Sequence, residues 1–179
     1  MEQGKQKVAF WLMPAAEPRA VFTSLINELA ARFDAPVFEP HVTLQGAELQ
    51  EERAIELLDA IAATSAPLQL QVSDVEFSDK YTKTLYAQFR PSERSAELSN
   101  AITRAIGDNG YQFDPHLSLL YKTLPEAVKS ELARETNIPL EQVHFDAVQL
   151  VSIPRAIKRA EDVRAWRTIA ERRLTGTSK

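Results

Sequence analysis

Two stretches of the chain, Phe-Glu-Pro-His-Val-Thr-Leu at residues 38–44 and Phe-Asp-Pro-His-Leu-Ser-Leu at residues 113–119, are copies of one motif. Four positions are identical, and the other three exchange Glu for Asp, Val for Leu and Thr for Ser. The motif histidines, His41 and His116, are 75 positions apart and are two of only three histidines in the chain. The repeat therefore predicts an internal duplication in which each half presents one histidine.

The alternation of polar and apolar residues predicts that each motif enters a β-strand. Successive side chains of a strand point to opposite faces, so His41 shares a face with Thr43, and His116 shares a face with Ser118. We expect the Val and Leu residues between and after them to lie on the helices of the same half. The proline before each histidine holds the preceding residue extended and fixes how the strand is entered. If a pseudo-two-fold axis relates the halves, both polar faces meet across one cleft.

Two imidazoles and two hydroxyls in one cleft suit phosphoryl chemistry. An imidazole with an ordinary pKa of about 6.5 acts as a base or an acid near neutral pH. One ring can take a proton from water while the other gives a proton to the leaving oxygen. The hydroxyls of Thr43 and Ser118 can donate hydrogen bonds to the non-bridging phosphate oxygens. This scheme needs no metal and no other cofactor.

The motif also has other interpretations. Duplication of a purely structural element would repeat it too, and we assign such a structural or surface role to the remaining histidine, His144. Two histidines without a partnered carboxylate or thiol make a poor zinc set, which normally has three or four ligands. We expect Glu39 and Asp114 to face solvent or to stabilise a turn. Ser118 lies two residues after His116 and outside any nucleophile elbow, which argues against Ser-His-Asp catalysis.

Outside the motifs, hydrophobic periodicity predicts the remaining elements. Strands are expected at 8–13, 41–45, 68–72 with Phe77 as a candidate extension, 85–89, 116–120 and 142–153. Helices are expected at 19–33, 48–63, between Pro91 and Asn109-Gly110, and from a Thr123-to-Glu126 capping box to about 136. The tail at 162–174 fits a helix or a final strand. The order β-α-β-α-β occurs twice, which predicts an α+β fold with two strand-and-helix halves, each with two helices. We treat residues 1–179 as one domain with pseudo-symmetric halves at roughly 1–80 and 81–179.

Composition limits the class of partner. The net charge is −4, with 8 basic and 13 acidic residues in 1–90 against 13 basic and 12 acidic in 91–179. This balance argues against a broad basic face for long nucleic acid, and the basic stretch from Arg155 to Arg173 is interpreted as solvated surface. The lack of cysteine fits a reducing, cytoplasmic location, and the apolar run before Pro14 is too short for a signal peptide or membrane span. We expect a monomer with no membrane partner.

The paired His-x-[Thr/Ser]-Leu resembles the signature of the two-histidine (2H) phosphoesterase superfamily. Phe-x-Pro-His-Val-Thr and Pro-His-Leu-Ser-Leu-Leu-Tyr are most similar to its cyclic phosphodiesterase branch, and the opening Val-Ala-Phe-Trp-Leu-Met-Pro is similar too. The resemblance spans nearly the whole chain. It implies a bilobal fold, with antiparallel sheets and two helices in each lobe, around a central cleft without metal.

The resemblance also implies an activity and a set of site residues. The activity is hydrolysis of nucleoside 2′,3′-cyclic phosphate or ADP-ribose 1″,2″-cyclic phosphate to a phosphomonoester. His41 and His116 are then the acid-base pair, Thr43 and Ser118 bind the phosphate, and Trp11 and Tyr121 line the cleft. Tyr86, which occupies in the second half the kind of position that Trp11 has in the first, is a further candidate for stacking on a base. Residues 78–83 lack the aromatic run expected of this branch.

Two further functional hypotheses follow from the same residues. A 2H enzyme of RNA processing would act on 2′,5′ linkages or RNA ends and would carry a basic rim around the cleft. A non-catalytic module of the same fold would bind nucleotide phosphates without turnover. A cyclic mononucleotide and an oligonucleotide, compared as substrates, separate these hypotheses from cyclic phosphodiesterase activity.

Overall fold

The computed structural model describes residues 4–177 and has an α+β architecture. The elements are β1 (Gln6–Pro14), α1 (Ala16–Phe33), β2 (Val42–Leu49), α2 (Glu51–Thr64), β3 (Leu68–Phe77), η1 (Tyr81–Lys83), β4 (Leu85–Phe89), α3 (Glu93–Ile106), β5 (His116–Leu120), α4 (Glu126–Glu135), β6 (Gln142–Ser152), α5 (Ala160–Arg164) and β7 (Arg167–Arg173). Each strand pairing is antiparallel. The predicted fold class is confirmed.

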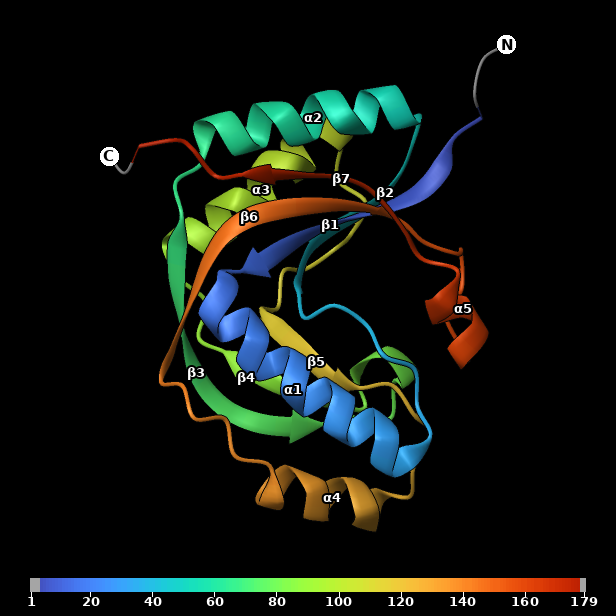
Figure 1. The fold of residues 1–179 in the computed structure, drawn as a ribbon. Helices are drawn as coiled ribbons and strands as arrows, with labels where there is room; N and C mark the ends of the chain where they lie inside the picture. Colours follow the sequence, from blue (N-terminus) through green and yellow to red (C-terminus); the bar gives the residue numbers. More distant parts are fainter. Residues whose placement is uncertain (1–3, 178–179) are drawn as a thin grey trace.

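The strands form an almost closed ring that divides into two sheets. Their order is β1-β2-β5-β4-β3-β6-β7, and β6 returns to pair with β1. The pairing between β2 and β5 is the shortest in the ring, because it consists of the single residue pair Val42 and Leu117. On the opposite side, β6 pairs with β3 up to Phe145 and with β1 from Phe145 onward. The ring therefore holds two lobes that are joined along β6 and at the two motifs (Figure 1).

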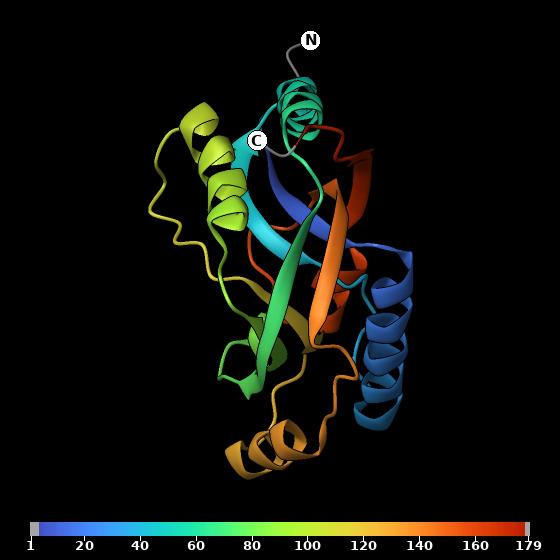
Figure 2. The ribbon, with the colours of Figure 1, turned by 90° about the vertical axis from the view of Figure 1, so that its left-hand side faces the viewer.

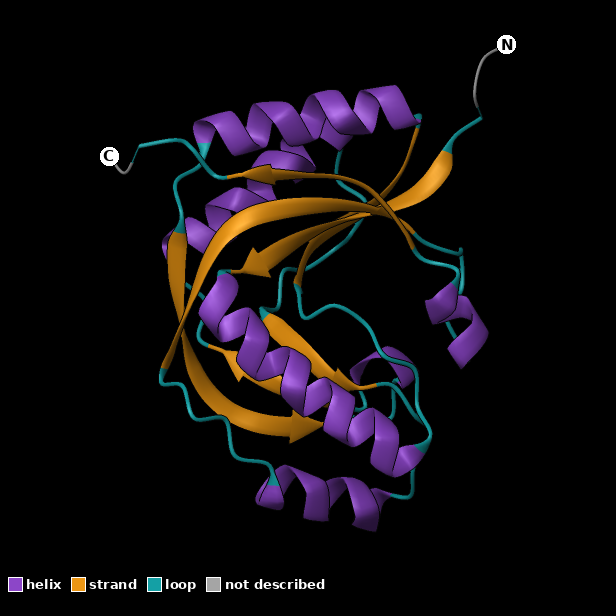
Figure 3. Cartoon of the chain, in the orientation of Figure 1, coloured by secondary structure: helices purple, strands orange, loops and turns teal. Residues whose placement is uncertain are grey.

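Each lobe carries two of the long helices. The first lobe contains β1, β2, β7 and the second part of β6, and it is covered by α2 and α3. The second lobe contains β3, β4, β5 and the first part of β6, and it is covered by α1 and α4. Figure 2 shows α2 and α3 at one end of the molecule, α4 at the other end, and α1 along the side. Figure 3 shows the strands between these helices.

The two halves of the sequence exchange elements between the lobes. Strand β3, from the first half, pairs with β4 of the second, and β6, from the second half, pairs with β1 of the first. Helix α1 packs on β5, and α3 packs on β2, so the expectation that each motif strand lies on the helices of its own half is wrong. The exchange is the same in both directions, as expected for a duplication. Each lobe nevertheless contains parts of both sequence halves, which periodicity within one half cannot reveal.

Local signals at the helix ends were less reliable than the hydrophobic faces. The capping box predicted at Thr123 is wrong, because α4 begins after Pro125 without a side-chain cap. Helix α3 instead has a capping box formed by Ser92 and Ser95. The helix ends at Ile106, before the predicted Asn109-Gly110 stop. Gly107 follows as the C-cap with a φ of 90°, a backbone conformation that favours glycine.

The end of β2 also differs from the sequence prediction, because the strand expected at 41–45 runs from Val42 to Leu49. The strand expected at 68–72 continues to Phe77, the residue considered as its extension. The ambiguous tail contains both alternatives, because the short helix α5 is followed by strand β7.

Strand β1 separates two apolar clusters. Val8, Phe10 and Leu12 point into the main core, which contains apolar residues of both lobes. Trp11 lies on the opposite face, in a smaller cluster against which Trp166 packs. The alternation predicted for this strand is therefore present, and it places Trp11 on the side of β1 that faces away from the main core. Within residues 4–177, no helix has both the length and the apolar character needed to cross a membrane.

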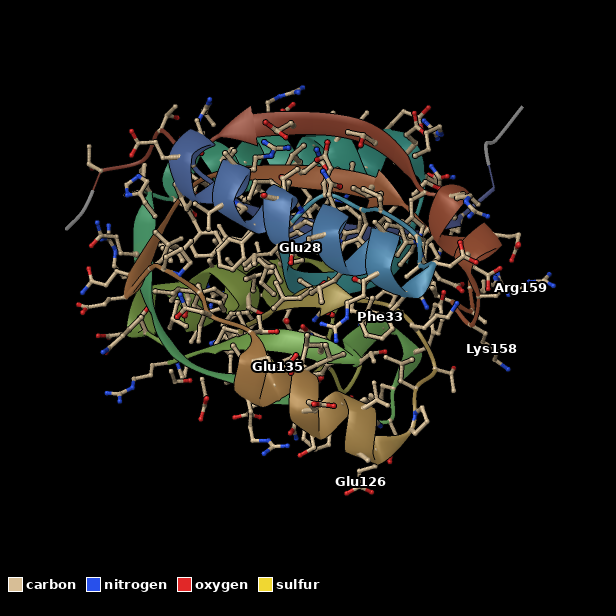
Figure 4. All side chains as sticks on the ribbon, turned by 60° about the horizontal axis from the view of Figure 1, so that its bottom comes forward. Glu28, Phe33, Glu126, Glu135, Lys158 and Arg159 are labelled. Carbon is tan, nitrogen blue, oxygen red and sulfur yellow. The ribbon has the colours of Figure 1, made fainter. Side chains whose placement is uncertain are left out.

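The basic C-terminal stretch lies on the surface and is largely neutralised by neighbouring acids. Lys158 and Arg159 extend away from the fold beside α5 (Figure 4). Arg159 lies 3.9 Å from a carboxylate oxygen of Glu161 and the same distance from one of Asp162. Farther along, Arg172 is 2.7 Å from Asp59 of α2. This surface matches the solvated interpretation of the stretch.

Candidate active site

Both copies of the motif line one cavity of about 850 Å³ between the lobes. Six of the predicted site residues line this cavity, namely His41, Thr43, His116, Ser118, Trp11 and Tyr121. A second hollow of about 600 Å³, beside α1 and the end of β7, contains none of them. The duplication thus brings both histidine-hydroxyl pairs to the same solvent-accessible space.

Each imidazole is held in the same way by its own motif. His41 Nδ1 lies 2.6 Å from the Glu39 carbonyl oxygen, and His116 Nδ1 lies 2.8 Å from the Asp114 carbonyl oxygen. A carbonyl oxygen can only accept a hydrogen bond, so Nδ1–H is the donor in both rings. In the neutral imidazole the lone pair is then on Nε2. Both rings are consequently set up to exchange protons through Nε2.

His41 lies in an aromatic enclosure. Its ring stacks on Trp11, with centroids 3.7 Å apart and planes inclined by 10°, and Trp166 approaches at 6.0 Å with its plane at 76°. Only 7 % of the residue is exposed. Burial, which disfavours the imidazolium, lowers the pKa of His41 to about 4, against the opposing effect of the hydrogen bond to Glu39. His41 is therefore neutral at physiological pH in the absence of an anionic ligand.

The low pKa of His41 predicts that the folded protein loses stability as pH falls from about 6.5 to about 4. In that interval the unfolded chain binds a proton at His41 that the folded chain excludes, and above it the residue contributes no pH dependence. Urea unfolding measured at about pH 7.5 and about pH 4.5 should show that the free energy of unfolding falls less between the two pH values for His41→Gln than for the wild type. Equal losses in the two proteins would contradict this environment for His41.

His116 has a more polar setting than His41. Its side chain is 21 % exposed, and the Tyr86 ring meets it edge-on at 5.4 Å. Burial lowers the pKa of His116, the hydrogen bond to the Asp114 carbonyl opposes that shift, and the charge of Lys83 adds to it. The two imidazoles thus share a tautomer but differ in exposure and in neighbouring charge.

The two motif hydroxyls are not equivalent. Ser118 Oγ donates a 2.8 Å hydrogen bond to the Thr82 carbonyl oxygen. The Thr43 hydroxyl has no hydrogen-bond partner among residues 4–177, although Tyr111 donates to the Thr43 carbonyl at 3.0 Å. The Thr43 hydroxyl can therefore donate a hydrogen bond to a ligand without losing an existing one. The Ser118 hydroxyl must first break its hydrogen bond to the Thr82 carbonyl.

The three aromatic candidates occupy different positions. Trp11 lines the cavity and stacks against the His41 ring. Tyr121 also lines the cavity, because β5 ends at Leu120 and the alternation of faces ends with it. Its ring stacks on Phe38 at 3.9 Å. Tyr86 does not line the cavity, since its ring packs against His116 and its hydroxyl donates to Glu76 at 3.0 Å. It therefore supports His116 instead of offering a face to a base.

Sequence reasoning missed several residues of the cavity. Trp166 lies between α5 and β7 and lines the cavity near His41. Lys80 lies just before η1 and Lys83 at its end, in the segment that lacks the expected aromatic run. One signal was available, since the chain has only two tryptophans and both are here. The lysines gave no periodic signal. Within residues 4–177, no group of three or more His, Asp or Glu side chains is placed to hold a metal ion.

A ring of antiparallel strands with two histidine motifs at its central cavity is the arrangement expected of a two-histidine phosphoesterase. Residues 18–156, well over half of the chain, match the model of the 2′-5′ RNA ligase superfamily. The chain belongs to that superfamily of 2H phosphoesterases.

Solved structures show the same fold. TT0787 of Thermus thermophilus is similar with a TM-score of 0.65 and 15% sequence identity, over 96% of this chain and 100% of that one. E. coli LigT complexed with 3′-AMP is similar with a TM-score of 0.60 and 16% identity, over 96% and 99% of the two chains. No curated protein sequence matches the chain.

Proposed function

We propose that this protein is a metal-independent phosphodiesterase that opens a cyclic phosphodiester, such as a nucleoside 2′,3′-cyclic phosphate, to a phosphomonoester. The observation that carries the proposal is the matched pair of imidazoles, each fixed by Nδ1 to a backbone carbonyl and each lining the same cavity. Membership of a phosphoesterase superfamily supports the reaction type. The E. coli LigT structure contains 3′-AMP, and a nucleoside 3′-phosphate is one product of opening a 2′,3′-cyclic phosphate.

In the proposed reaction, one Nε2 takes a proton from water as the water oxygen bonds to phosphorus. The bond from phosphorus to one ribose oxygen breaks, and the other imidazole protonates that oxygen. A bound phosphate anion favours the charged form of a neighbouring imidazole, so one of the two rings is protonated when substrate is present. The Thr43 hydroxyl, and Ser118 after it leaves Thr82, donate to the non-bridging oxygens.

A second candidate is hydrolysis or ligation of a 2′,5′ linkage in RNA. The superfamily description names 2′-5′ RNA ligation. Lys7, Lys80 and Lys83 line the cavity, where they would attract the phosphate of an additional nucleotide. Such a substrate needs more of the 850 Å³ space than a cyclic mononucleotide does.

A substrate panel tests both candidates. The protein, with a chelator present, is incubated with 2′,3′-cyclic nucleotides, ADP-ribose 1″,2″-cyclic phosphate and a 2′,5′-linked dinucleotide, and the product isomers are identified by chromatography. We expect turnover of a cyclic phosphate that is insensitive to the chelator. Exclusive turnover of the dinucleotide would favour the second candidate. Binding of all three without turnover would leave a non-catalytic module, and loss of activity with the chelator would overturn the metal-independent mechanism.

A further inference from the structure

The acidic residue two positions before each histidine accepts hydrogen bonds from the same kinds of group in both motifs. In the second motif, the Asp114 carboxylate accepts hydrogen bonds from Lys83 Nζ at 2.6 Å and from Gln88 Nε2 at 2.9 Å. The backbone carbonyl of the same residue accepts from His116 Nδ1 at 2.8 Å. A cation and a glutamine therefore hold the residue that sets the tautomer of the imidazole.

The first motif repeats this arrangement. The Glu39 carboxylate accepts hydrogen bonds from Arg19 Nη2 at 2.8 Å and from Gln149 Nε2 at 3.1 Å. Its carbonyl accepts from His41 Nδ1 at 2.6 Å. Again one cation, one glutamine and one imidazole converge on a single acidic residue.

Duplication alone does not account for this agreement. Arg19 lies in α1, after β1, whereas Lys83 lies in η1, before β4. Gln149 belongs to β6, and Gln88 belongs to β4. Because the cations and the glutamines come from positions that do not correspond in the two halves, the same contacts are built twice from different residues.

The structure assigns Glu39 and Asp114 as positioning residues that fix the orientation and tautomer of His41 and His116 through their backbone carbonyls. The assignment rests on the proposed function only where it concerns catalysis. The proline after each acid has a fixed φ, so anchoring the carboxylate restrains the whole turn that leads to the imidazole. Asp114 and Glu39 side chains are 51 % and 53 % exposed, and half-exposed ion pairs add little to global stability. Their loss should thus disturb the turn and leave the fold intact.

Imidazole ¹⁵N NMR tests the assignment without any substrate. The chain has only three histidines, and the exposed His144 on β6 serves as an internal reference. The wild type should show Nδ1–H tautomers for His41 and His116. We expect Asp114→Ala to convert His116 to a mixture of tautomers while His41 keeps its signal, and Glu39→Ala to do the reverse.

Matched variants separate positioning from general damage. Asp59→Ala removes an aspartate of nearly equal exposure, 52 %, from an ion pair with Arg172, and it should leave all three imidazoles unchanged. Asp114→Glu keeps a carboxylate, as the first motif does, and should restore most of the wild-type tautomer. Lys83→Met removes the cation without touching Asp114, and it should shift His116 in the same direction as Asp114→Ala.

Kinetics then measures the catalytic consequence. With the substrate found by the panel, Asp114→Ala and Glu39→Ala should each lower kcat by about 10-fold with little change in KM, because a misplaced group loses alignment and not ground-state binding. An unchanged His116 tautomer in both Asp114→Ala and Lys83→Met would overturn the assignment. A wild type that turns over no substrate would instead overturn the proposed function, because the NMR result does not depend on activity.

Discussion

Replacing either His41 or His116 by Ala is expected to lower kcat/KM for a cyclic phosphodiester by about 10²–10⁴-fold, the usual contribution of a positioned general acid or base. Each variant removes one of the two Nε2 atoms that the motif carbonyls leave available at the cavity. Since the two rings act on one transition state, kcat/KM of the double variant should be only slightly lower than that of the less active single variant.

His144 provides the matched control for this experiment. It lies on β6, is exposed and does not line the cavity, so His144→Ala should retain wild-type turnover. His41 is buried against Trp11, and the unfolding midpoint of its variant must be measured alongside the rate. A folded His41→Ala or His116→Ala protein with wild-type kcat/KM would exclude the acid-base pair.

The second large effect concerns the motif hydroxyls. Thr43→Val keeps the shape of the side chain but removes a donor that is unpaired in the described structure. We expect kcat to fall by about 10²–10³-fold, as for other donors aimed at a developing oxyanion. Ser118→Ala should lower kcat less than Thr43→Val does. The Ser118 hydroxyl already donates to the Thr82 carbonyl and must exchange that hydrogen bond for one to the phosphate.

The control for the hydroxyl experiment is Thr64→Val. Thr64 is exposed at the end of α2, where its hydroxyl donates to the Ala60 carbonyl, and the substitution should not change kcat. Steady-state kinetics on the four proteins gives the comparison. An equal or larger loss for Ser118→Ala would contradict the inequality between the two hydroxyls.

The sequence predicted the parts of the fold that depend on local pattern. The period of apolar residues located the helices and most strands, and the duplicated motif placed His41 and His116 at equivalent points of the two halves. Alternation also predicted that Trp11 lies on the face of β1 opposite the main core. These features depend on neighbours within a few positions, which is the range over which strand and helix periodicity acts.

Apart from the helix ends, the features that the sequence did not predict depend on long-range contacts. The exchange of β3 and β6 between the lobes is a choice of pairing partner, which the alternation of residues within one strand does not specify. Trp166 lies within a tail whose pattern fits both a helix and a strand, and it stands between the α5 helix and the β7 strand that are both present. Glu39 is half-exposed and anchors a turn, as expected, but its carboxylate partner Gln149 is 110 positions away in the sequence. No local pattern encodes that contact.

The most direct test of the central claim is a crystal structure of the wild-type protein with inorganic phosphate or a nucleoside 3′-phosphate bound. The account predicts one phosphate in the cavity, with oxygens about 3 Å from Nε2 of both His41 and His116 and a hydrogen bond from the Thr43 hydroxyl. A phosphate bound elsewhere, or imidazoles turned so that Nε2 of either ring faces away from it, would contradict the shared two-histidine site.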